Sequence, residues 1–60
     1  MLPQDPVMLL SFVNMKLREM YTSFDAMVDD LGISSEESKA IVDKLNQIGY
    51  TYEKEKNKFI

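Results

Sequence analysis

Apolar positions recur every three or four residues over residues 6–21, which is the spacing of an amphipathic α-helix. Asp5 and Pro6 form a suitable start. An aspartate can accept hydrogen bonds from free backbone N–H groups, and a proline needs no N–H at the first helical position. We therefore predict a helix over about residues 6–21. Its expected core face consists of Leu9, Leu10, Val13, Leu17, Met20 and Tyr21.

A second apolar group lies roughly opposite that core face. Met8, Phe12 and Met15 follow the i, i+4, i+7 spacing that places residues on one side of a helix. Two interpretations stay open. The group packs under the N-terminal arm or the C-terminal hairpin, because a small domain must use its apolar surface. Alternatively, it is an exposed contact surface for another chain, to which flexible methionines are suited.

A shorter helix is predicted over about residues 24–31. Ser23 can cap its start, and Gly32 can supply the left-handed residue that ends a helix. The face that we expect to be buried consists of Phe24, Met27, Val28 and Leu31.

A third helix is predicted over about residues 35–48. Ser34 can cap it, and Glu37 completes an S-x-x-E capping box with that serine. Gly49 ends this helix as Gly32 ends the previous one. The expected buried positions are Ile41, Leu45 and Ile48, with Val42 at the edge.

The pattern changes to a period of two in residues 50–60, which indicates a β-hairpin. A four-residue loop would place Tyr52 opposite Phe59 and Glu53 opposite Lys58. This register pairs aromatic rings on the inner face and opposite charges on the outer face. A two-stranded hairpin is unstable alone, so its aromatic side chains must pack on the helices. Those side chains belong to Tyr50, Tyr52 and Phe59.

Three helices and a hairpin form a mostly α (α+β) fold, predicted as a single domain over residues 1–60. The layout resembles the winged helix-turn-helix family, in which the third helix enters the major groove of DNA and the wing touches the backbone. The sequence departs from that family at Val28, where a small residue is usual, and at Ser38, where an apolar residue is usual. The resemblance rests on Val28, residues 31–34, Ile41, Leu45 and the Gly49–Tyr50 junction.

The charge distribution disfavours a DNA-binding role. Residues 24–49 carry six acids and two lysines, a net −4, whereas residues 1–23 sum to zero and residues 50–60 to +1. Affinity for DNA comes mainly from Lys and Arg at phosphates. The predicted third helix instead opens with two glutamates. A nucleic-acid role would have to use Lys39, Lys54, Lys56 and Lys58.

The residue types that most enzyme and metal sites need are scarce. The chain has no cysteine and no histidine, so it lacks disulfides, thiolate ligands, the commonest metal ligand and the commonest general base. Ser35 and Lys39 share a helix face, but a solvated serine in a first helical turn explains that spacing. We expect no enzymatic activity, no catalytic residue, no cofactor, no metal site and no small-molecule substrate.

No segment has the pattern of a membrane span or a secretory signal. The longest apolar run, residues 7–10, is far too short for a bilayer, and no basic stretch precedes it. We expect a cytoplasmic protein without a membrane partner.

A closer resemblance covers nearly the whole chain. The opening LPQDPVMLLSFVNMKLREMY and the closing LNQIGYTYEKEKNKF are similar to a short bacterial family known only as a domain of unknown function. The resemblance implies a complete small protein of about this length. It implies no activity and assigns no functional residue.

The function that we predict is a non-catalytic protein-interaction or self-associating module. Its interface residues would be Met8, Phe12 and Met15, and its partner another protein or a second copy in a homodimer. The alternative prediction is a winged-helix DNA-binding transcriptional regulator.

Overall fold

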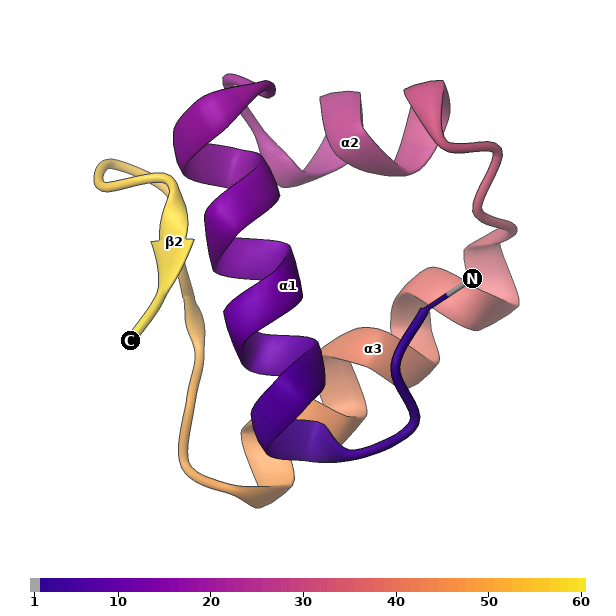
Figure 1. Cartoon of the computed structure of the whole chain (residues 1–60), viewed down its shortest axis with the longest axis vertical. Helices are drawn as coiled ribbons and strands as arrows, with labels where there is room; N and C mark the ends of the chain where they lie inside the picture. Colours follow the sequence, from indigo (N-terminus) through magenta and orange to yellow (C-terminus); the bar gives the residue numbers. More distant parts are fainter. Residues whose placement is uncertain (1) are drawn as a thin grey trace.

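The computed structural model describes residues 2–60 and consists of three helices followed by an antiparallel hairpin. Figure 1 shows α2 crossing one end of α1, α3 crossing the other end, and the hairpin alongside α1. The central helix α1 contacts both other helices and β2. The predicted mostly α fold with a C-terminal hairpin is confirmed. The elements are α1 (Pro6–Glu19), α2 (Phe24–Asp30), α3 (Ser35–Gln47), β1 (Tyr52–Glu53) and β2 (Lys58–Phe59).

Polar caps begin each helix where the sequence predicted them. Asp5, Ser23 and Ser34 each accept a hydrogen bond from the backbone N–H three residues later. Glu37 returns the contact to Ser34, because its Oε1 accepts the Ser34 backbone N–H at 3.2 Å. This reciprocal capping box satisfies two N–H groups that would otherwise lack a partner.

Left-handed glycines end α2 and α3. Gly32 has φ 68° and Gly49 has φ 89°, values that an L side chain rarely adopts. In each case the next N–H donates to a carbonyl five residues earlier, at 3.0 Å after Gly32 and 2.9 Å after Gly49. These bonds close the last helical turn and reverse the chain.

The helices end slightly earlier than predicted. At the end of α1, the N–H groups of Met20 and Tyr21 both donate to the carbonyl of Lys16, at 2.9 and 3.1 Å. Two donors on one acceptor interrupt the regular i→i−4 series, so the helix does not continue to Tyr21. The observed last residues are Glu19, Asp30 and Gln47.

The buried core draws on all three helices and the hairpin. Each of its members belongs to an apolar face that the sequence predicted, and three of them, Val13, Met27 and Leu45, have no exposed surface. The seven core residues are Leu9, Val13, Leu17, Met27, Ile41, Leu45 and Phe59.

Four apolar residues that we expected to be buried are exposed instead. Met20, Leu31 and Ile48 lie at or just beyond the end of a helix, where the chain leaves the helical path and the 3.6-residue period no longer determines which side is buried. Tyr50 precedes β1, and its N–H donates to the Leu45 carbonyl at the end of α3. The exposed fractions are 60% for Met20, 41% for Leu31, 37% for Ile48 and 37% for Tyr50.

The hairpin has the predicted register, Tyr52 opposite Phe59 and Glu53 opposite Lys58. Its inner aromatic rings pack on α2. The Phe24 ring lies 5.8 Å from Tyr52 and 5.5 Å from Phe59 between centroids, and the two hairpin rings lie 5.4 Å apart. Such spacings are favourable for tilted and edge-to-face aromatic pairs.

A polar contact between side chains joins the ends of α1 and α2. The Tyr21 hydroxyl donates to Asp30 Oδ2 at 2.7 Å. This hydrogen bond, together with burial and the negative charge of Asp30, raises the pKa of Tyr21 above its ordinary value of 10.0. Because the pKa is raised in the folded state, the contact stabilises the fold fully below the unfolded-state pKa. That stabilisation is lost as the pH rises through the folded-state value.

We therefore expect the tyrosine absorbance titration of the wild type to extend to higher pH than that of Asp30→Asn. The matched control is Asp29→Asn, which removes a neighbouring charge without touching the Tyr21 hydroxyl bond. Identical titrations of the wild type and Asp30→Asn would contradict this assignment.

Candidate functional site

The outer face of α1 carries exposed apolar side chains. Val7 and Met8 are each 62% exposed and Met15 is 44% exposed. From Val7 to Met15 the helix rises about 12 Å, so this face runs along about half of the 23 Å width of the molecule. We call Val7, Met8 and Met15 the outer apolar face.

Phe12 is not part of this outer apolar face. Its ring is half-buried, packs against the core, and lines a hollow beneath the N-terminal arm together with Leu2. The Lys16 Nζ lies 5.5 Å from the ring centroid. The prediction that placed Phe12 on an exposed face with the two methionines is corrected, because the N-terminal arm covers one side of its ring. For Phe12, the interpretation of packing under the arm holds.

The N-terminal arm is held on α3 by one lysine. Lys44 Nζ donates to both the backbone carbonyl and the side-chain Oε1 of Gln4, each at 3.3 Å. These contacts keep the arm over Phe12 and away from the outer apolar face.

A groove separates α1 from the hairpin, and Met15 lies at its border. The hairpin side contributes Lys56 and Lys58. The structure thus brings together a methionine assigned to protein contact and two lysines assigned to the nucleic-acid alternative. The residues lining the groove are Leu10, Ser11, Asn14, Met15, Leu17 and Arg18 from α1, and Lys56, Asn57 and Lys58 from the hairpin.

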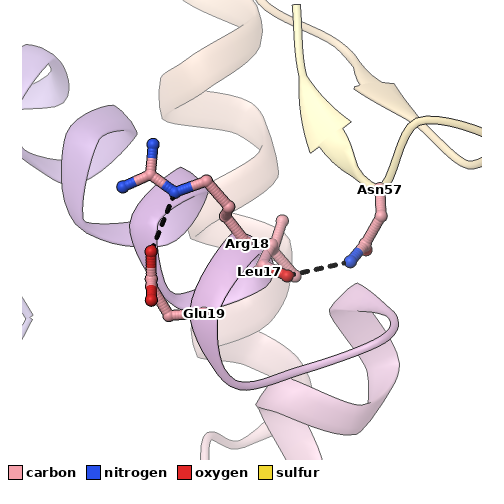
Figure 2. A network of polar contacts seen from close by, with 4 residues as sticks. All are labelled: Leu17, Arg18, Glu19 and Asn57. Carbon is pink, nitrogen blue, oxygen red and sulfur yellow. Dashed lines mark hydrogen bonds and ion pairs between the residues drawn. The ribbon is translucent and has the colours of Figure 1, made fainter.

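The groove lysines have no acidic partner within residues 2–60. Lys58 lies opposite Glu53 in the sheet register, but Glu53 Oε1 accepts the backbone N–H of Glu55 at 3.2 Å instead. The described residues contain one ion pair, Arg18 Nε to Glu19 Oε2 at 3.0 Å, seen in Figure 2. Both of its side chains are mostly exposed, so solvent screens it and it contributes little.

The other two candidate lysines lie outside the groove. Lys39 is exposed on α3, on the side that also carries Glu36 and Asp43. Lys54 lies in the hairpin turn and does not line the groove. The four lysines therefore do not form one basic surface.

Asn14, which our sequence prediction did not single out, fixes β2 on α1. Its Oδ1 accepts the Phe59 backbone N–H at 2.8 Å, and its Nδ2 donates to the Phe59 carbonyl at 3.1 Å. Asparagine favours caps and turns over helix interiors, so its place in the middle of an apolar helix was a signal.

Asn57 fixes the hairpin turn on the end of α1. Its Nδ2 donates to the carbonyls of Leu17 at 3.1 Å and Tyr21 at 2.9 Å, and the first of these bonds is drawn in Figure 2. Its Oδ1 accepts the Tyr52 hydroxyl at 2.7 Å, and that hydroxyl accepts the Phe24 N–H at 3.2 Å. Asn57 also adopts φ 54°, which asparagine tolerates better than most residues.

The described part of the chain shows no arrangement typical of a metal or membrane site. Within residues 2–60, no three side chains among His, Cys, Asp and Glu come together as a metal site would require. None of the helices there combines the length and apolarity needed to cross a bilayer.

A comparison with protein families matches residues 3–59 to the family described as Domain of unknown function (DUF4250). The chain belongs to this family. The match confirms the resemblance to a domain of unknown function, and the description of DUF4250 names no activity. No curated protein and no solved structure matches the chain.

Proposed function

We propose that this DUF4250 domain is a non-catalytic interaction module that self-associates through the outer apolar face of α1. The observation that carries the proposal is the exposure of Val7, Met8 and Met15 along one side of a helix whose other sides are packed. Apolar residues gathered on one side of a small protein are typical of a contact surface.

An α1-to-α1 contact between two copies uses this face on both sides. Such a contact is isologous and closes on itself, so it yields a dimer rather than a filament. Ser11 lies between Val7 and Met15 on the helical wheel and is exposed. A small side chain there lets the two helices approach, and the flexible methionines can fill the space around it.

Charge also favours this face for self-contact. Residues 1–23, which include α1, sum to zero, whereas residues 24–49 carry a net −4. Two copies that meet through α1 incur little net repulsion. Two copies that meet through α2 and α3 would bring like charges together, which is unfavourable.

The area of such a contact places it at the weak end of specific interfaces. A stable interface buries about 1,200 Å² or more in total, or about 600 Å² per copy. That share is about one seventh of the 4281 Å² surface of this chain. One helical face of a small domain supplies about this area, so we expect reversible association that depends on concentration.

Replacing Met8 by glutamate is expected to shift the domain to the monomer by at least about tenfold in dissociation constant, because a carboxylate would be desolvated in the contact. Sedimentation equilibrium measures this shift. Met20→Glu is the matched control, since Met20 is also exposed, at 60%, but lies past the end of α1. A wild type that stays monomeric at millimolar concentration would sink the proposal, as would equal effects of the two substitutions.

The alternative of DNA binding takes second place. It is supported by Lys56 and Lys58, which have no acidic partner among the described residues. Against it stand Glu36 and Asp43 on the exposed side of α3, the helix that would enter the major groove. Their charges repel the phosphates that supply most of the affinity.

A further inference from the structure

We propose that the groove between α1 and the hairpin binds an acidic segment of a partner protein, one that carries apolar side chains among its carboxylates. This surface is separate from the self-association proposed above. The two surfaces overlap at Ser11 and Met15, whereas Met8 lies outside the groove.

The groove offers the two features that such a segment needs. Leu10, which is half-buried, and Met15, which is 44% exposed, form an apolar part of its wall. Lys56 and Lys58 add cationic groups on the hairpin side, whereas Arg18 on the α1 side is already paired with Glu19. Apolar contacts can supply affinity, while the positive charges select a negatively charged partner and set its orientation.

The two groove lysines are available to a partner. Glu53, the acid opposite Lys58 in the sheet, is turned toward the Glu55 backbone N–H. The single ion pair among residues 2–60 uses Arg18 and leaves both lysines without a carboxylate. A carboxylate from another protein would therefore not have to displace one from this chain.

The walls of the groove are held before any partner arrives. Asn14 joins α1 to the backbone of Phe59, and Asn57 joins the hairpin turn to the carbonyls of Leu17 and Tyr21. A preformed site loses less conformational entropy on binding than a mobile one.

The lining of the groove disfavours a nucleic-acid strand. Single-stranded nucleic acids bind through aromatic side chains on which bases stack, in addition to positive charge. Among residues 2–60, no aromatic side chain lines the groove. The nearby rings of Phe24, Tyr52 and Phe59 pack on one another instead.

A second copy of this chain is a poorer occupant than another protein. The acids of the chain are concentrated in residues 24–49, and on α3 they share the exposed side with polar residues such as Gln47. A contact between two different surfaces of identical copies would also be head-to-tail and would not close on itself in general.

The test is a titration of the wild-type domain into a fluorescently labelled peptide rich in glutamate and containing leucines, followed by fluorescence anisotropy at low salt. We expect saturable binding that weakens as salt is added. The double variant Lys56→Gln/Lys58→Gln should bind at least about tenfold more weakly. The matched control Lys39→Gln/Lys54→Gln removes the same charge outside the groove and should bind within about twofold of the wild type.

Three outcomes would overturn the proposal. They are no binding of the peptide by the wild type at low salt, equal weakening in the two double variants, and tighter binding of a labelled single-stranded or duplex DNA than of the peptide. A peptide with glutamine in place of glutamate should not bind. Met8→Glu should keep peptide binding while it weakens self-association, so failure of one proposal leaves the other measurable.

Discussion

Replacing Phe59 by alanine is expected to lower the free energy of unfolding by about 3–5 kcal/mol. Phe59 is 1% exposed and its ring contacts those of Phe24 and Tyr52. Removing it leaves a cavity at the junction of the hairpin and α2, and the hairpin has little stability without that contact. A domain of 60 residues has a thin margin of stability, so this loss should leave much of the population unfolded at 25 °C.

Urea unfolding followed by circular dichroism measures this effect. The control is Ile60→Ala, which truncates the neighbouring apolar side chain where it is 47% exposed. We expect that control to change the free energy of unfolding by less than about 1 kcal/mol. Equal effects at the two positions would show that the hairpin does not pack as described.

The second large effect is expected at Asn57. Asn57→Ala removes the side-chain donor to the carbonyls of Leu17 and Tyr21. It also leaves alanine at φ 54°, a left-handed conformation that alanine adopts less readily than asparagine. We expect a loss of about 2–4 kcal/mol, from carbonyls left without partners and from left-handed strain.

Asn57→Gly separates these two causes. Glycine accepts the positive φ but cannot donate to the α1 carbonyls, so its cost should be smaller than that of alanine by about 1 kcal/mol. Asn46→Ala is the control, since Asn46 is exposed on α3. Thermal unfolding would contradict the account if Asn57→Ala were no more destabilising than Asn46→Ala.

Hydrophobic periodicity predicted the parts of the fold that depend on regular elements. Within a helix the angle between residues is constant, so the core positions of α1, such as Val13 and Leu17, follow from spacing alone. The hairpin register could be predicted from a four-residue loop and from the alternation of side chains between the two faces of a strand, which is as regular as the helical period. The caps at Ser23 and Ser34 followed from local chemistry.

What could not be predicted depends on contacts between distant parts of the chain. Asn14 bonds the backbone of Phe59, which is 45 positions away, and apolar periodicity says nothing about a polar residue with such a partner. Met20 was expected in the core because the helical period was extended past the end of α1, and Tyr50 because the period of two was extended to a residue that precedes β1.

In the candidate site too, spacing along the chain predicted some features, and contacts between distant segments determined the others. Met8 and Met15 are exposed on one side of α1, as their spacing indicated. Phe12 is covered because the N-terminal arm crosses it. The path of an arm without regular secondary structure cannot be predicted from hydrophobic periodicity. The groove that joins Met15 to Lys56 and Lys58 exists because the hairpin docks on α1, which spacing along the chain does not reveal.

The most direct test of the central claim, that the outer apolar face of α1 is a self-contact surface, is a methionine-methyl NMR dilution series. Met8 and Met15 lie on that face, Met20 is exposed off the face, and Met27 is buried in the core. The account predicts concentration-dependent shifts for the Met8 and Met15 methyl signals, with those of Met20 and Met27 constant. Signals that all stay fixed, or a Met20 signal that moves as far as that of Met8, would contradict it.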